Sequence, residues 1–291
     1  MVKIDLHIHS TYSDGKLSPK ELVDKAFERN ISAIAITDHD SAKGNEEAMR
    51  YAKQKGIDYI QGIEITITPP EFCKELHIVG LFIDPRNKEI IEIKQRHKKY
   101  AKGVIKEIIK KLKRLGYEID LKELEKETKG KRFGRPYLAD QLVKRYPGEF
   151  SDQKEVFNKL LGRNGKAFVR PKGTKMKKAI EIIHRAGGIA IVAHPWYLDE
   201  CMEKVIEEFS HLGGDGIERD YPEKESIPAD IGERLDRLIE KYSLVVSGGT
   251  DFHDINSSKN KDLGDRGLTK EEFEKLKRFA RSKKKLINIM K

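Results

Sequence analysis

Short apolar runs alternate with amphipathic stretches along most of the 291 residues, and this alternation restricts the fold more than any other feature of the sequence. Residues Val2 to His9 alternate like a strand, a helix is expected from Ser18 to Asn30, and Ile31 to Ile36 form a second apolar run. The pattern then repeats, with strands expected at 58–67, 75–83, 188–193, 216–218 and 243–247, and helices at 44–56, 174–187, 198–212 and 229–241. About seven strands that alternate with helices predict a parallel α/β architecture.

The stretch from residue 87 to residue 172 breaks this alternation. Apolar residues from Val104 to Leu115 recur there with helical period. Further helices are expected at 120–127, 136–145 and 152–161. We therefore predict a mainly helical insertion between the fourth and fifth strands. Its first helix carries ten Lys and Arg residues between 94 and 114; such a run is usually a solvated helix face, and contact with nucleic acid is the alternative.

Composition and charge narrow the class of protein. Lys and Arg number 58 and Asp and Glu 48, which gives a formal net charge of +10. The longest apolar runs are far shorter than the about 20 residues that a bilayer span needs. The two cysteines, Cys73 and Cys201, lie far apart and indicate neither a disulfide framework nor a cysteine metal site. We therefore expect a cytoplasmic protein with no membrane partner and no evident obligate protein partner, in which Lys283 to Lys285 form a solubilising end.

Six of the nine histidines follow short apolar runs and stand beside other polar residues. With the carboxylates that share this placement, they are His7, His9, Asp14, His39, Glu64, His77, His194, Asp251 and His253. Functional groups collect at the carboxyl ends of strands in parallel α/β folds, and buried polar groups are costly unless they are paired or bind a metal. Any one of these residues alone could be structural, and Asp14 could instead cap a turn with Gly15.

This mixture of imidazoles and carboxylates is too large for one ion. It predicts two or three divalent metal ions. Imidazole and carboxylate ligands together suit Mn, Zn or Fe better than Mg, and Mn is the ion that we favour. A site with two metals indicates hydrolysis of a phosphate ester by a metal-activated hydroxide.

The order of the motifs resembles the polymerase and histidinol phosphatase (PHP) family. The motifs are Asp5-Leu6-His7-Ile8-His9-Ser10, Ser13-Asp14-Gly15, Thr37-Asp38-His39-Asp40, Gly62-Ile63-Glu64, His77-Ile78-Val79-Gly80, Ala193-His194-Pro195 and Thr250-Asp251-Phe252-His253. The resemblance implies a distorted seven-stranded (β/α) barrel that holds up to three metals. The barrel, the catalytic domain, would comprise residues 1–86 and 173–291, and the helical insertion domain residues 87–172.

The family's metal ligands carry over to nine positions of this sequence. The resemblance implies His7, His9 and Asp251 for the first metal, Glu64 as the bridge to the second, His77 and His194 for the second, and Asp14, His39 and His253 for the third. Of these, Asp14, His39, Glu64 and His194 are the residues expected to act in catalysis. Asp5, Asp38 and Asp40 are placed to accept hydrogen bonds from the ligating imidazoles, although Asp38 and Asp40 could instead cap the segment that follows them.

The insertion and Gly134-Arg135-Pro136 resemble one branch of the family, which hydrolyses nucleoside 3′,5′-bisphosphates and trims short RNA from the 5′ end. Arg135 is the candidate catalytic phosphate clamp, because a guanidinium binds phosphate oxygens in bidentate fashion. Tyr137 and His253 are the other expected substrate contacts. Tyr137 stands where that branch usually has His, and Asp254 where the family often has Gly, so both departures lie near the substrate.

The sequence therefore predicts a metal-dependent phosphoesterase that acts on nucleotides or short 5′-phosphorylated RNA. A histidinol-phosphate or sugar-phosphate phosphatase is the alternative among enzymes, and the long basic insertion argues against it. A non-catalytic nucleic-acid-binding module with the same motifs is the alternative of another class, and the complete set of ligands argues against that.

Overall fold

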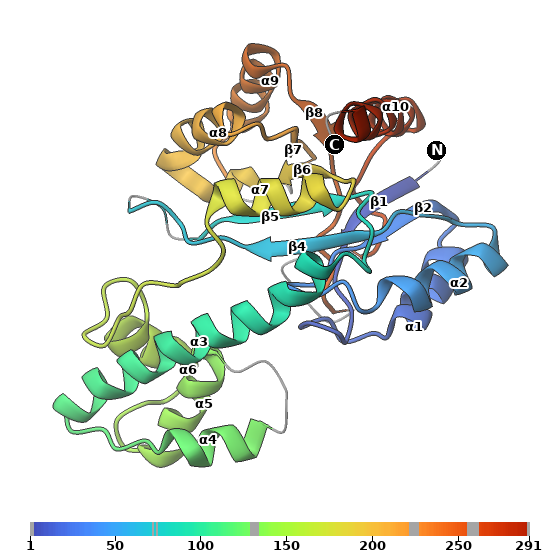
Figure 1. The fold of residues 1–291 in the computed structure, drawn as a ribbon. Coiled ribbons are helices and arrows are strands. Elements are labelled where there is room, and N and C mark those ends of the chain that lie inside the picture. Colours follow the sequence, from blue (N-terminus) through green and yellow to red (C-terminus); the bar gives the residue numbers. More distant parts are fainter. Residues whose placement is uncertain are drawn as a thin grey trace. The chain divides into compact units, whose positions relative to one another are not determined.

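The computed structural model describes residues 3–71, 73, 75–128, 134–220, 227–254 and 262–289 (Figure 1). The chain divides into two compact units. The larger unit comprises residues 1–94 and 174–291, and the smaller unit residues 95–173. Each unit has its own buried apolar core. The described residues have the mixed α/β content that the sequence predicts.

The larger unit contains two β-sheets. One has the order β1 (Lys3–Ile8), β2 (Ile31–Ile36) and β3 (Asp58–Tyr59), and its strands are parallel. The other has the order β4 (Gly62–Thr66), β5 (His77–Leu81), β6 (Ile189–Val192), β7 (Gly216–Glu218) and β8 (Val245–Ser247). Isolated bridges outside the named strands pair Ile8 with Phe252 and His39 with Glu64. Strand ends from both sheets therefore lie close to one another.

The expected all-parallel arrangement is wrong for one strand, because β5 is antiparallel to both β4 and β6. The cause is the connection between β4 and β5. The described residues of segment 67–76 contain no helix, and a short link without a crossover helix returns the chain in the opposite direction. The single strand expected at 58–67 is also divided, since β3 pairs with β2 whereas β4 pairs with β5.

The helices of the larger unit begin and end near the predicted residues. They are α1 (Pro19–Glu28), α2 (Asn45–Lys55), α7 (Met176–Arg185), the 3₁₀ helix η2 (Pro195–Cys201), α8 (Met202–His211) and α9 (Ile231–Tyr242). The start of α1 is a capping box, in which the Ser18 hydroxyl accepts from the Glu21 N–H and the Glu21 carboxylate accepts from the Ser18 N–H. Pro19 fits the first helical position, where its missing N–H has no partner to lose.

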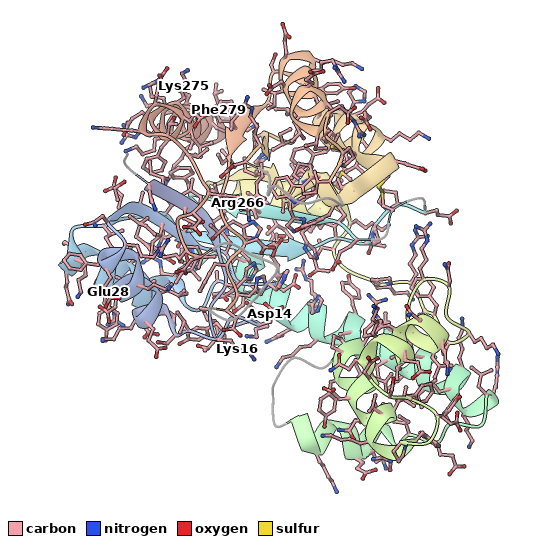
Figure 2. The ribbon with its side chains drawn as sticks, turned by 180° about the vertical axis from the view of Figure 1, so that it is seen from behind. Asp14, Lys16, Glu28, Arg266, Lys275 and Phe279 are labelled. Carbon is pink, nitrogen blue, oxygen red and sulfur yellow. A yellow bond between two sulfur atoms is a disulfide. The ribbon has the colours of Figure 1, made fainter. Side chains whose placement is uncertain are left out.

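One helix of the larger unit is absent from the prediction. Helix α10 (Lys270–Ile289), on which Figure 2 labels Lys275 and Phe279, buries Phe273 and Leu276 in the core that strands of both sheets share. The expectation of a solubilising end is therefore wrong for Lys283, whose Nζ lies 2.8 Å from Oδ1 of the buried Asp215. High charge hides the apolar stripe of this helix in the sequence.

The smaller unit is helical in its described residues, as predicted. Its elements are most of α3 (Lys88–Arg114), then α4 (Leu121–Thr128), α5 (Arg135–Arg145), α6 (Gln153–Val156) and the π-helix η1 (Phe157–Leu161). The stripe Val104, Ile105, Ile108 and Leu112 of α3 is buried in the core of this unit. The basic residues of α3 that lie beyond position 97 are exposed.

The structure joins Cys73 and Cys201 in a disulfide, which corrects the expectation from the sequence. The two residues are 128 positions apart, yet both are buried in the same apolar cluster, and their Cα atoms lie 5.9 Å apart. Separation along the chain could not reveal this proximity, because folding packs the segment before β5 against the end of η2.

None of the helices in the described parts of the chain is long and apolar enough to cross a membrane. The longest, α3, carries lysines and arginines along its length. The cytoplasmic location stays a prediction from the sequence.

We predict that Asp215→Asn destabilises the fold. Asp215 Oδ2 accepts from the Ala190 N–H at 2.8 Å and lies 2.7 Å from His184 Nε2, while its Oδ1 meets Lys283. The substituted side chain would carry no negative charge, so the Ala190 N–H, His184 and Lys283 would lose a charged acceptor. This loss should lower the free energy of unfolding by about 3 kcal/mol. Urea unfolding at pH 7 measures the difference, and equal midpoints for the two proteins would contradict it.

The same pair of proteins has a predicted pH dependence. Burial raises the pKa of Asp215, but His184 and Lys283 outweigh burial and hold it below the ordinary value of 3.8. A depressed pKa stabilises the fold above the unfolded value and loses that contribution as pH falls through the folded value. The difference in unfolding free energy should therefore be constant above about pH 5 and shrink below pH 4.

Candidate metal centre

The nine predicted ligands meet in the larger unit, although they are spread over most of the chain. They lie in or after strands β1, β2, β4, β5, β6 and β8, so the carboxyl-end placement expected from the sequence holds for most of them. Each of the six histidine rings has another of the six within 4.0–6.2 Å, measured between ring centroids. Asp14, in the loop after β1, marks this region in Figure 2.

The first ligand group consists of His7, His9, Asp251 and the Oε2 atom of Glu64. The two Nε2 atoms of His7 and His9 lie 3.1 Å apart. Asp251 Oδ1 lies 3.5 Å from His7 Nε2 and 3.1 Å from His9 Nε2, and Glu64 Oε2 lies 3.5 and 3.3 Å from the same two atoms. Four ligands placed 2.0–2.1 Å from a tetrahedral metal lie about 3.3 Å from one another. The spacing of this group therefore fits a transition-metal cation.

The second ligand group consists of His77, His194 and the other carboxylate oxygen, Glu64 Oε1. His77 Nδ1 and His194 Nε2 each lie 3.1 Å from Glu64 Oε1 and 3.3 Å from each other. This triangle has the dimensions of one face of the same tetrahedron. Glu64 thus directs one oxygen to each group, which is the arrangement of a carboxylate that bridges two cations.

The third ligand group consists of His9, Asp14, His39 and His253, whose candidate ligand atoms all lie within 4.8 Å of one another. It is looser than the others, since the nitrogens of the three histidines lie 3.4–3.8 Å from the Asp14 oxygens. The sequence predicts three of these residues, and His9 joins them through its Nδ1 atom. His39 also reaches the centre, because its Nδ1 lies 2.9 Å from Glu64 Oε2.

The charges of the centre compensate one another. Burial opposes a proton on His9, but hydrogen bonds with Asp251 and Glu64 outweigh burial and raise the pKa of His9 to about 9. For His77, burial is likewise outweighed, here by the charge of Glu64, and its pKa rises to about 10. Burial raises the pKa of Glu64, yet the surrounding imidazoles hold it well below its ordinary value. The buried carboxylates thus require positive charge, which divalent cations could supply in place of protons.

Two ligands have unusual backbone conformations. His194 has φ of 30° and Asp251 has φ of 54°, in the left-handed region that non-glycine residues rarely adopt. Such conformations cost of order 1–3 kcal/mol and cluster at functional sites. They turn the chain sharply after β6 and β8, where the two side chains face the centre.

The sequence predicts Asp5, Asp38 and Asp40 as acceptors for the imidazoles, but the structure gives them other donors. These donors are hydroxyl and backbone N–H groups of the strand ends and loops: Thr250 for Asp5, Ser10 and Ser13 for Asp38, and Thr66 for Asp40. The three aspartates therefore fix the segments that carry the ligands.

Glu218, the last residue of β7, is the acceptor that the sequence analysis missed. Its side chain is buried, and its Oε1 lies 2.7 Å from His7 Nδ1. The sequence did carry a signal for Glu218, because it is a charged residue at the end of a short apolar strand. Several of the predicted ligands have the same placement. Glu75 was missed as well, and its Oε1 lies 3.3 Å from His77 Nε2.

A PHP domain model matches residues 5–191, which is more than half of the chain. The chain belongs to the PHP family. A 5′-3′ exoribonuclease of Haemophilus influenzae is 35% identical over 276 residues, which cover 90% of this chain and 96% of the relative. A 3′,5′-nucleoside bisphosphate phosphatase of Chromobacterium violaceum is 29% identical, and the match covers 87% of this chain and 88% of that relative.

The fold is also similar to that of a solved structure. An amidohydrolase from Chromobacterium violaceum, described with bound sulfate and no metal, has a TM-score of 0.75 and 27% sequence identity. The match covers 95% of this chain and 96% of that chain. The fold of that structure is therefore shared over nearly the whole length of this chain, including the part that follows residue 191.

Arg135 and Tyr137 of this PHP protein belong to the smaller unit. Arg135 begins α5, and Tyr137 packs partly buried against the core of that unit. The metal-ligand groups lie in the larger unit, so contact of these two residues with a substrate stays a prediction.

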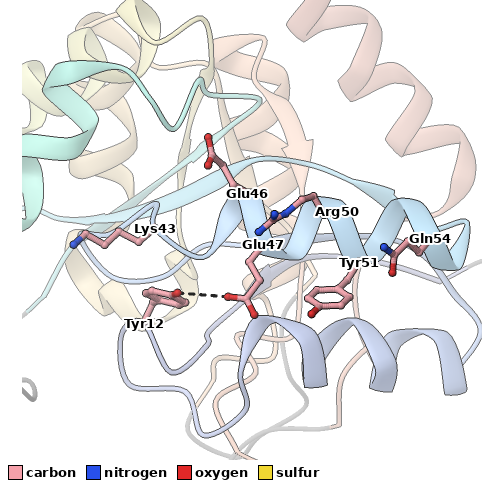
Figure 3. A pocket seen from close by; sticks show the side chains of 7 residues that line it. All are labelled: Tyr12, Lys43, Glu46, Glu47, Arg50, Tyr51 and Gln54. Carbon is pink, nitrogen blue, oxygen red and sulfur yellow. Dashed lines mark hydrogen bonds between the residues drawn. The ribbon is translucent and has the colours of Figure 1, made fainter.

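The larger unit also has a surface hollow of about 430 Å³ beside α2 (Figure 3). Its lining residues are Tyr12, Lys43, Glu46, Glu47, Arg50, Tyr51 and Gln54. The Tyr12 hydroxyl donates to Glu47 Oε2 at 3.4 Å, as the dashed line shows. Two acidic residues balance two basic ones, so the lining offers no excess of positive charge to a phosphate.

We predict that Glu64→Ala removes more than one metal ion per chain, because each of its oxygens belongs to a different ligand group. The matched variant His253→Ala removes a ligand of the third group alone and should lose at most one ion. Both proteins are loaded with Mn(II), desalted and measured by plasma mass spectrometry. Wild-type metal content in Glu64→Ala would contradict the bridging geometry.

Proposed function

We propose that this metal-dependent phosphoesterase hydrolyses nucleoside 3′,5′-bisphosphates or short 5′-phosphorylated RNA, with two or three divalent cations and Mn(II) as the favoured ion. The observation that carries the proposal is the spacing of 3.1–3.5 Å between ligand atoms around both oxygens of Glu64. The names of the two curated relatives, a phosphatase and an exoribonuclease, support the substrate class.

The nine ligand residues would hold the cations in the three groups described above. When bound, the cations supply a water of lowered pKa and positive charge for the phosphoryl oxygens. Glu64 sets the separation of the first two groups, and His194 and His39 turn their imidazoles toward its two oxygens. Asp14, with the third group, lies at the more exposed side of the centre, where a substrate phosphate can enter.

We assign the choice of substrate to residues outside the first and second ligand groups. Arg135 would clamp a phosphate, with Tyr137 and His253 as further contacts. The exposed basic side of α3, which includes Lys98, supports contact with a nucleic acid. In this proposal residues 1–86 and 173–291 form the catalytic domain, and the insertion 87–172 helps to recognise the substrate.

The distorted seven-stranded barrel of the family is part of the same proposal. Two observations support closure of the two sheets into one barrel. The isolated bridges join Ile8 in β1 to Phe252 after β8, and His39 after β2 to Glu64 in β4. One apolar cluster also draws buried side chains from β1, β2, β5 and β6, strands that belong to both sheets.

We predict release of inorganic phosphate from adenosine 3′,5′-bisphosphate by the Mn(II)-loaded protein, with a loss of at least about 100-fold after chelation because the attacking hydroxide needs the metal. A colorimetric phosphate assay measures it, with 5′-phosphorylated oligoribonucleotides, histidinol phosphate and sugar phosphates in parallel. Turnover of the last two alone would favour the alternative phosphatase. RNA binding without hydrolysis of any substrate would favour the non-catalytic module.

We predict that Arg135→Ala lowers kcat/KM for the preferred substrate roughly 10- to 100-fold, the cost of a lost hydrogen bond to a charged group. Metal content should stay at the wild-type level, because Arg135 lies outside the ligand groups. Arg135→Lys keeps the charge without the bidentate geometry, so its kcat/KM should lie between those of the wild type and of Arg135→Ala. Unchanged kinetics in Arg135→Ala would rule out the clamp.

A further inference from the structure

Glu218 contacts one residue of the first ligand group and one of the second. Its Oε1 lies 2.7 Å from His7 Nδ1, and its Oε2 accepts a hydrogen bond of 2.6 Å from the backbone N–H of His194. The residue is 1% exposed and ends β7, which is held between β6 and β8. The carboxylate therefore has a fixed position, and both of its oxygens are engaged by residues of the metal centre.

The first contact determines which nitrogen of His7 can bind a metal. A neutral imidazole carries its proton on one nitrogen and a lone pair on the other, and the partner of the first nitrogen selects the tautomer. Because Glu218 can only accept at Nδ1, the proton stays there. The lone pair of Nε2 then faces His9 Nε2 at 3.1 Å, inside the first ligand group.

The second contact fixes the backbone of His194. This residue has φ of 30°, a conformation that its own side chain disfavours. The hydrogen bond from its N–H to Glu218 holds the chain in that turn, and the turn aims His194 Nε2 at Glu64 Oε1, 3.1 Å away. Without this acceptor, the partly buried N–H of His194 would lose its hydrogen bond and the turn would relax.

We propose that Glu218 is a positioning residue that prepares both ligand groups at once: it sets the tautomer of His7 and the backbone turn of His194. The inference rests on the proposed metal centre and deepens it. Glu64 links the two groups through its two carboxylate oxygens, and Glu218 links them through His7 Nδ1 and the backbone N–H of His194. Loss of Glu218 should therefore weaken metal binding in both groups, although it touches no metal itself.

The test uses Glu218→Gln, which keeps the size of the side chain. A glutamine has one acceptor oxygen, so it can serve His7 or His194 but not both, and its amide would face a donor. We expect the affinity for Mn(II) to fall about 10- to 100-fold at both the first and the second ligand group. Competition with a fluorescent chelator, without substrate, measures this affinity. The visible spectrum of the Co(II)-loaded protein, which reports ligand geometry, should change as well.

Asp215→Asn is the matched control. Asp215 is also a buried carboxylate, directly precedes β7 and accepts a backbone N–H from β6, but its partners lie outside the ligand groups. It should lower thermal stability and leave Mn(II) affinity and the Co(II) spectrum unchanged. If Glu218→Gln does not fold, Glu218→Asp keeps the charge with a shorter reach, and should show the same weakening to a smaller extent.

The outcomes separate the inference from the function on which it rests. Wild-type affinity and an unchanged Co(II) spectrum in Glu218→Gln or in a folded Glu218→Asp would overturn the role of Glu218 and leave the phosphoesterase proposal intact. Absence of Mn(II) affinity in the wild-type chain would overturn the metal centre and this inference with it. Equal weakening in Asp215→Asn would show a general loss of stability instead of positioning, and would overturn the inference as well.

Discussion

The structure of the centre depends on the charge of one buried carboxylate. Glu64 lies in β4 with its side chain fully removed from water, and an uncompensated charge in that position would cost several kcal/mol. Imidazoles from several strands surround it and hold its pKa well below the ordinary value. The compensation must come from different directions, because each oxygen faces a separate set of nitrogens. A fold that brings several strand ends together meets this requirement, and a single helix or hairpin could not.

The same requirement explains where the backbone departs from regular structure. The turns at His194 and Asp251 place side chains toward the centre at the cost of an unfavourable φ. The hydrogen bonds of Asp38 to Ser10 and Ser13 hold the loop after β1 beside the end of β2. These interactions fix the segments that carry the ligand atoms, so the side chains of the centre lie close together.

The sequence could identify the residues that meet around Glu64 because their signal is local. A polar residue that closely follows a buried strand, such as His39 or His194, can be found without knowledge of the tertiary structure. The direction of β5 could not be found in this way, since it depends on whether a short connection contains a crossover helix. The pairing of Cys73 with Cys201 depends on packing across the core. Helix α10 had a readable period in Phe273, Leu276 and Ala280, but charged residues between them obscured it.

Glu218 was missed for a different reason, which bears on how such centres are read. A ligand belongs to a motif of several residues, whereas a residue that orients ligands needs only one carboxylate at the end of one strand. The two relatives carry the names of different activities, an exoribonuclease and a nucleoside bisphosphate phosphatase. Hydrolysis of a P–O bond makes the same demand on a metal centre whether the substrate is RNA or a bisphosphate. In the proposed function, the choice of substrate therefore belongs to residues other than those around Glu64. On that proposal the ligands around Glu64, with Glu218 behind them, would serve either substrate, and Arg135 and Tyr137 would distinguish between the two.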